Sequence, residues 1–143
     1  MDEYIKPICE LDFITYMVDN PGTDKIEVSL LSEGIVEEFT RDELFESLCI
    51  LISPLFAEFV HKVRLAHNYG EYYSQTSKHL KSLESITWEQ AHELAHYKAM
   101  YAEYKCDKKR LRHELLDTYG FNKLHKATKL YEGLYRIPSS RLW

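Results

Sequence analysis

The chain has 143 residues, of which 45% are hydrophobic and 29% are charged, the ordinary composition of one globular domain. Five glycines and four prolines are few for a turn-rich sandwich or barrel, so the composition favours helices. A formal net charge of −5 argues against a nucleic-acid-binding protein, because such domains are usually basic. We therefore expect one domain over residues 1–143, of the α+β class and mainly helical.

The net charge conceals a division of charge along the chain. Residues 1–60 contain 14 acidic and 3 basic residues, a net charge of −11. Residues 61–143 contain 9 acidic and 15 basic residues, a net charge of +6, together with all seven histidines and nine of the eleven tyrosines. Oppositely charged ends attract each other, either within one fold or between copies or partners.

The cysteines and the apolar runs bear on the cellular compartment. Cys9, Cys49 and Cys106 are widely spaced and form no CxxC pair, so we expect neither a disulfide framework nor a structural zinc site. Cys49 lies in an apolar stretch and Cys106 on an alanine-rich helix face, which predicts buried thiols. The N-terminus has no signal-peptide pattern, and the longest apolar run is broken by Ser53-Pro54. A cytoplasmic protein without membrane contact is expected.

The first forty residues are predicted to form a short antiparallel β-meander. The segments 11–18, 25–31 and 35–39 are rich in β-branched and aromatic residues, and turn-forming residues separate them. This acidic, β-rich part covers residues 1–40. A helical part follows over residues 41–143, and it is basic and tyrosine-rich from about residue 61.

Capping signals mark the first helices. Thr40 and Glu43 have the spacing of a capping box, in which a hydroxyl and a carboxylate satisfy each other's backbone amides. Ser53-Pro54 predicts that one helix ends and another starts, because proline is tolerated in a first turn. Tyr69-Gly70 is expected to end this second helix. Residues 71–84 are expected to form a weaker helix or an ordered loop.

The clearest predicted element is a helix over residues 88–118. Thr87 and Gln90 form a second capping-box pattern, and Tyr119-Gly120 is a stop signal. No glycine or proline interrupts these residues, so the helix is expected to be about 45 Å long. A shorter helix over 122–133 is predicted to follow.

Four flanks divide the surface of this long helix. A line of small residues below one tryptophan suits the close approach of another helix: Trp88, Ala91, Ala95, Ala99, Ala102 and Cys106. Nearly opposite lie Tyr97, Tyr104, Leu111 and Leu115. Between them runs a basic flank of Lys98, Lys105, Lys108 and Arg112 with Tyr101, and on the other side an acidic flank of Glu89, His92, Glu93, His96, Glu103 and Asp107. Two opposed apolar faces predict a helix covered on both sides, either by helices 54–69 and 122–133 or by a partner.

The string HELAH at residues 92–96 resembles the zinc-binding helix of the zincin peptidases. The resemblance covers five or six residues and implies that His92 and His96 bind zinc, while Glu93 activates the metal-bound water. A third ligand from a later turn would complete the site. Glu114 follows His96 by 18 residues, but in a continuous helix it lies about 27 Å away. A zinc hydrolase is therefore our third functional hypothesis.

Two further hypotheses are stronger. The first is a small non-enzymatic interaction or assembly protein, which docks another protein or a second copy through Tyr97, Tyr104, Leu111 and Leu115. The alternative is a nucleic-acid-binding accessory protein that uses the basic, tyrosine-bearing face of residues 98–112 and the C-terminal helix. Its cationic surface contacts phosphates through Lys98, Tyr101, Lys105, Lys108, Lys109 and Arg112. Further charge is expected from Lys123, Lys126, Lys129, Arg136 and Arg141, and rings that stack on bases from Tyr69, Tyr72, Tyr73, Tyr131 and Tyr135. No GxSxG, P-loop or GxGxxG pattern is present, so no cofactor and no small-molecule substrate are expected.

Overall fold

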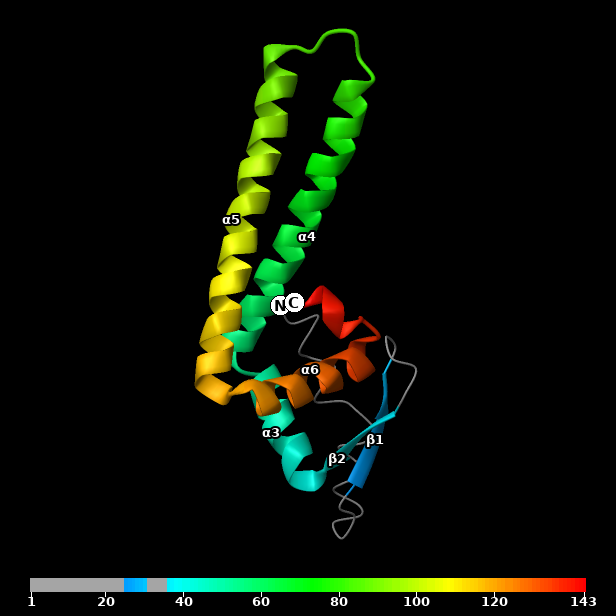
Figure 1. Ribbon diagram of the computed structural model, residues 1–143, viewed down its shortest axis with the longest axis vertical. Helices are drawn as coiled ribbons and strands as arrows, with labels where there is room; N and C mark the ends of the chain where they lie inside the picture. Colours follow the sequence, from blue (N-terminus) through cyan, green and yellow to red (C-terminus); the bar gives the residue numbers. More distant parts are fainter. Residues whose placement is uncertain (1–24, 31–35) are drawn as a thin grey trace.

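The computed structural model describes residues 25–30 and 36–143, and it begins with a two-stranded antiparallel sheet (Figure 1). Strand β1, Lys25–Ser29, pairs with β2, Val36–Thr40. This confirms the antiparallel pairing expected for the second and third predicted strands. The predicted strand at 11–18 lies outside the described residues.

Two consecutive helices follow the sheet, and each starts where its cap was predicted. Helix α3 spans Arg41–Leu51, with Thr40 as its N-cap. The Glu43 amide donates to the Thr40 hydroxyl at 3.2 Å, and the Thr40 amide donates to the Glu43 carboxylate at 2.9 Å. Helix α4, Pro54–Lys81, starts at Ser53, whose hydroxyl accepts a hydrogen bond from the Phe56 amide at 3.3 Å. The predicted capping box and the predicted restart are both confirmed.

Helix α4 does not end at Tyr69-Gly70, so that prediction was wrong. It continues to Lys81, as one helix of 28 residues. A Cβ atom on Gly70 would lie 3.1 Å from Cε1 of the Tyr101 side chain. Glycine at this position therefore allows the Tyr101 ring of the next helix to pack closely against the α4 backbone. The sequence pattern could not distinguish this packing glycine from a helix stop.

The long helix was predicted correctly. Helix α5 spans Trp88–Tyr119, and its first turn has the predicted capping box between Thr87 and Gln90. Gly120 ends it with a φ of 83°, a conformation that suits glycine. Helix α6, Phe121–Tyr135, then extends two residues beyond the predicted end. A short 3₁₀ turn, η2 at Ser139–Arg141, lies close to the C-terminus.

Helices α4 and α5 form a long antiparallel hairpin that projects away from the rest of the molecule (Figure 1). Helix α6 crosses its base and contacts α3, while the sheet lies beside α3 and α6. The fully buried large side chains come from this base, which we call the body: Phe39, Leu44, Leu51, Phe56, Phe59, Leu111, Leu115, Leu124 and Leu130.

The outer part of the hairpin, residues 67–110, is called the distal hairpin here. Leu80 is its only buried hydrophobic residue. Its two helices meet through aromatic rings instead. The Tyr69 ring of α4 lies 5.5 Å from that of Tyr104, and the Tyr72 ring lies 5.6 Å from that of Tyr97. Half-buried tyrosine contacts therefore replace an apolar core in this region.

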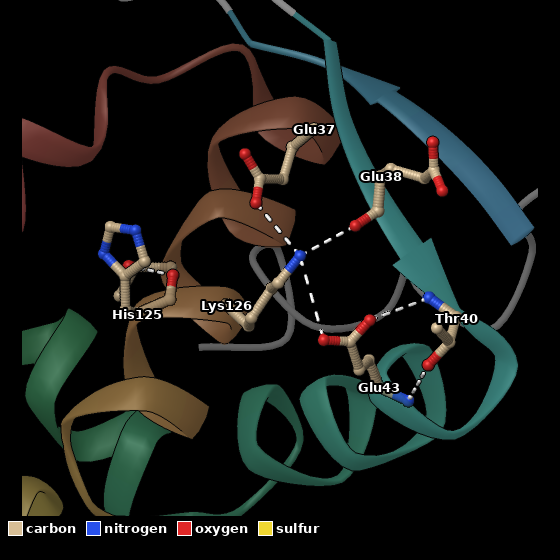
Figure 2. A network of polar contacts seen from close by, with 7 residues as sticks. Glu37, Glu38, Thr40, Glu43, His125 and Lys126 are labelled. Atoms are coloured by element: carbon tan, nitrogen blue, oxygen red, sulfur yellow. Dashed lines mark hydrogen bonds and ion pairs between the residues drawn. The ribbon is translucent and has the colours of Figure 1, made fainter.

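Some acidic and basic residues from the two parts of the chain pair with each other in the body (Figure 2). Lys126 on α6 donates to the Glu37 carboxylate at 3.0 Å and to the Glu38 carbonyl at 2.7 Å, and its Nζ lies 3.9 Å from the Glu43 carboxylate. Its ammonium also lies 4.8 Å from the centre of the Phe39 ring. The hydrogen bond from the Thr40 amide is the largest cause that lowers the pKa of Glu43, and the charge of Lys126 lowers it further. Charges from the acidic and basic parts thus join α6 to β2 and α3.

The two described cysteines differ from their predicted environment. Cys49 and Cys106 are both exposed free thiols, so the prediction of buried thiols was wrong. Cys49 lies on the solvent side of α3, although its neighbours in the sequence, Leu48 and Ile50, are both buried. Cys106 lies on a face of α5 that no described helix covers.

Among the described residues, no single helix has both the length and the apolar character of a membrane span. Only α3 and α4 taken together meet these criteria, as a pair bent by 62°.

Candidate functional site

The predicted partner-binding face of α5 is covered by the chain's own helix α4. Leu111 and Leu115 are 1% and 0% exposed and belong to the core of the body. Tyr97 and Tyr104 contact Tyr69 and Tyr72 of α4 in the distal hairpin. The proposal that this face docks a partner is therefore corrected, because α4 is long enough to follow α5 along the whole hairpin.

The line of small residues on the opposite side of α5 is not covered by another helix of the described chain. We call it the small-residue stripe, and every member is exposed: Trp88, Ala91, Ala95, Ala99, Ala102 and Cys106. The expectation that helices of the same chain cover both sides of α5 was thus wrong for this side. The reason is geometric, since α6 crosses only the base of the hairpin and α4 occupies the tyrosine side (Figure 1).

Large apolar side chains gather at the tip of the hairpin. Leu83 and Ile86, in the connection between α4 and α5, are 37% and 48% exposed. Trp88, at the first position of α5, is 73% exposed and stacks on the His92 ring, at 5.0 Å and 10°. An exposed apolar cluster of this kind commonly marks an interaction site.

The HELAH residues lie on the solvent side of the distal hairpin. His92, Glu93 and His96 are all exposed. The Glu93 carboxylate accepts a hydrogen bond from the Tyr97 hydroxyl at 2.9 Å, and this bond raises the pKa of Tyr97. The His96 ring lies 6.4 Å from that of Tyr69. The glutamate is thus engaged in a contact within the helix.

No third metal ligand lies near these histidines in the described part of the chain. Within residues 25–30 and 36–143, no three histidine, cysteine or acidic side chains are placed to hold one metal ion. Glu114, the distant candidate, pairs with Arg110 at 3.0 Å. Asp107 pairs with Lys62 of α4 at 3.3 Å. The described geometry therefore gives the zinc-hydrolase hypothesis no support.

A groove lies where α4, α5 and the C-terminal segment meet, and we call it the basic groove. It has a volume of about 340 Å³. Its basic side chains come from all three elements: Arg64, His67, Lys105, Lys108 and Arg141. Its remaining walls are apolar or aromatic: Val60, Val63, Ala66, Tyr101, Tyr131, Ile137 and Leu142. No carboxylate is among the described residues that line it.

Two lysines of the basic groove, Lys105 and Lys108, lie beside other positive charges. Burial is the largest cause that lowers the pKa of Lys108, and the neighbouring charges of Arg112 and Lys105 lower it further. Lys105 lies over the Tyr101 ring, with its ammonium 5.7 Å from the ring centre. In the described ranges, Lys105, Lys108 and Arg141 form no salt bridge. The groove therefore concentrates positive charge at Lys105, Lys108 and Arg141.

Only half of the predicted nucleic-acid surface lies in this groove. Tyr101, Lys105 and Lys108 line it. Arg112 lines a separate apolar cavity of about 230 Å³ beside Trp143. Lys98 and Lys109 are exposed on α5 but are not among the lining residues.

Two basic lining residues, Arg64 and His67, were not predicted, because they come from a helix that is distant from α5 in the sequence. Arg64 and His67 share one side of α4, and their i, i+3 spacing was the available signal. Arg141 comes from η2, and nothing in the local sequence places η2 beside α5. The rings of Tyr69, Tyr72 and Tyr131 were expected to be platforms for bases, but the first two pack within the hairpin and the third is 3% exposed.

No protein-family model matches this chain, and neither does any curated protein or solved structure. Two surfaces of the described residues remain as candidates. One is the apolar tip with the small-residue stripe, and the other is the basic groove. They lie on different flanks of α5, so each can be tested without the other.

Proposed function

We propose that this chain is a small non-enzymatic interaction or assembly protein, which docks a macromolecular partner through its long helix. The observation that carries the proposal is the apolar tip on a projecting hairpin, where Trp88 is 73% exposed beside Ile86 and Leu83. Tryptophan is enriched among the residues that dominate binding energy at interfaces. The docking side is the exposed one, not the tyrosine side that the sequence favoured.

The small-residue stripe extends this surface along α5. From Trp88 to Cys106 it is about 27 Å long, at 1.5 Å per residue. Alanine side chains at the contact let two helices approach to the short end of the usual 8–10 Å separation. A helix from a partner can therefore lie along the exposed side of α5 that begins at Trp88.

The occupant that we propose is a second copy of this chain in antiparallel orientation. With the two-fold axis close to Ala99, Glu89 of one copy faces Arg110 of the other copy, and His96 faces Glu103. The two opposite pairings around the axis make the surface self-complementary, as an isologous dimer requires. Charge complementarity of this kind sets orientation and register.

Sedimentation velocity over a range of protein concentrations tests the proposal. We expect the full chain to shift from monomer to dimer as its concentration rises, and we expect Ile86→Asp with Trp88→Asp to remain monomeric. The matched control is Phe45→Asp with Phe121→Asp, which places two charges on exposed aromatic positions elsewhere, at 47% and 69% exposure. A wild-type monomer at every concentration, or an equal effect of both double variants, would contradict the proposal.

A cysteine placed at the predicted axis tests the antiparallel register. In a chain whose native cysteines are replaced by serine, Ala99→Cys should form a disulfide-linked dimer under mild oxidation, because its two copies lie next to the axis. Ala91→Cys is the control, since its two copies would lie roughly 24 Å apart. Cross-linking through residue 91 but not through residue 99 would exclude this register.

A further inference from the structure

The basic groove brings together cations that are far apart in the sequence. Arg64 comes from α4, and Lys105 and Lys108 come from α5. Arg141 comes from η2, and the C-terminal segment turns back so that it lies beside α4 (Figure 1). The three elements meet because the C-terminal segment packs against the body, where Leu142 is 2% exposed. The groove is therefore a product of the fold rather than of one charged helix face.

The fold places Lys105 and Lys108 in a different environment from the lysines of the body. Lys126 reaches two carboxylates and a carbonyl, and Lys123 lies 3.8 Å from the Glu46 carboxylate. In the described chain, Lys105 and Lys108 have no carboxylate within salt-bridge distance, although Lys108 is half-buried beside two other cations. Such an arrangement costs stability in the empty protein. An anion in the groove would remove that cost.

The shape of the cationic surface indicates a chain of phosphates rather than a single anion. Lys98 and Arg112 continue the basic flank of α5 on either side of the groove, so the cations extend over about 21 Å of helix. A single phosphate needs only one cluster of cations, whereas a line of cations matches successive charges of a polyanion. The apolar and aromatic walls beside the cations suit nucleobases and sugars.

We propose that the basic groove binds single-stranded nucleic acid, with Lys105, Lys108 and Arg141 contacting backbone phosphates and the Tyr101 wall contacting a base. The groove, at about 340 Å³, has room for part of a nucleotide but not for a duplex. A negatively charged protein segment would satisfy the same cations without using the aromatic wall. This site lies on a different flank from the small-residue stripe and stands whether or not the chain dimerises.

Fluorescence anisotropy with an end-labelled twenty-residue oligo-dT tests the proposal on the full chain. Three phosphate contacts predict that affinity falls roughly 20-fold between 50 and 200 mM monovalent salt. We expect Lys105→Gln with Lys108→Gln to weaken binding at least tenfold at low salt and to make the salt dependence shallower. The matched control is Lys78→Gln with Lys81→Gln, which removes the same charge from exposed positions of α4 and should change affinity less than twofold.

Competition separates the nucleic-acid strand from other anions. We expect unlabelled oligo-dT to displace the probe, and we expect dTMP or poly-glutamate at the same phosphate or carboxylate concentration to displace little. No binding at 50 mM salt would overturn the proposal, and so would equal losses in the two double variants. Displacement by dTMP would show a mononucleotide site instead, and displacement by poly-glutamate a site for acidic protein. The Ile86→Asp with Trp88→Asp variant should bind oligo-dT with unchanged affinity, so failure of one proposal can be told from failure of the other.

Discussion

The body and the distal hairpin are built from the same two helices, but different interactions hold them together. In the body, α4 and α5 contribute Phe56, Phe59, Leu111 and Leu115 to a core that α3, α6 and the sheet complete. In the distal hairpin, the same helices meet through half-buried tyrosine rings, and Leu80 is the only buried hydrophobic residue there. The difference indicates that the body provides most of the stability of the chain. The hairpin formed by α4 and α5 extends well beyond this body (Figure 1).

This contrast bears directly on function. An extended hairpin without its own apolar core contributes little to folding, yet its tip carries Leu83, Ile86 and Trp88 in solvent. Elements of low local stability are commonly those that bind. The basic groove lies where the two regions join, close to Ala66 and Tyr101. Both proposed surfaces are therefore presented by the hairpin and supported by the body.

The largest expected effect compares two residues on the same face of α5. Leu115→Ala should lower the free energy of unfolding by about 2–5 kcal/mol, because it leaves a cavity in the core of the body. Tyr97→Ala, about five turns nearer the tip, should lower it by only about 1 kcal/mol, because half-buried aromatic pairs contribute less. Urea unfolding followed by circular dichroism measures both. Equal losses would show that the distal hairpin has a stability of its own comparable to that of the body.

The polar network of the body gives the next largest effect. Lys126→Met should lower the free energy of unfolding by about 1–2 kcal/mol, because charged hydrogen bonds to Glu37 and Glu38 are lost and the site is partly screened by solvent. Lys98→Met, on the exposed flank of α5, is the control and should change stability within about 0.5 kcal/mol. The same unfolding experiment measures both variants. An unchanged free energy of unfolding in Lys126→Met would mean that the network does not join α6 to β2 and α3.

The smallest expected effect has the opposite sign. Lys108→Gln should raise the free energy of unfolding at pH 7 by on the order of 0.2–0.5 kcal/mol for each like-charge pair removed, with Lys105 and Arg112. The pKa of Lys108 is lower in the folded protein than its ordinary value of 10.5, so the cost of its charge is present at pH 7. That cost disappears as the pH rises through the folded pKa, and the advantage of the variant should be gone above pH 10.5. Urea unfolding at both pH values measures this, and a loss of stability at pH 7 would contradict it.

Local signals in the sequence were sufficient for most helices but not for the surfaces between them. The caps at Thr40, Ser53 and Thr87 depend on neighbouring residues, and each was found where it was predicted. Gly70 was misjudged because its role is set by Tyr101, a ring 31 positions away. The periodicity of α5 separated its flanks correctly, but it could not show which apolar flank α4 would cover.

The candidate sites illustrate the same limit. Lys105 and Lys108 were identified from their helical spacing, whereas Arg141 joins them only because η2 packs beside α4 and α5. The net charge of −5 argued against a nucleic-acid-binding protein, but a sum over the whole chain does not record where the charges lie. In the structure, Glu37 and Glu43 lie by Lys126, while the cations of the groove are grouped together.

Amide hydrogen exchange of the wild-type chain at two protein concentrations tests the central claim most directly, namely that the body holds the fold and the distal hairpin binds. At low concentration, we expect amides of residues 67–110 to exchange faster than those around Leu115 and Leu130, because their helices lack a core. At high concentration, residues 86–106 should become protected while the body is unchanged. Uniform protection along α4 and α5 that does not depend on concentration would contradict the account.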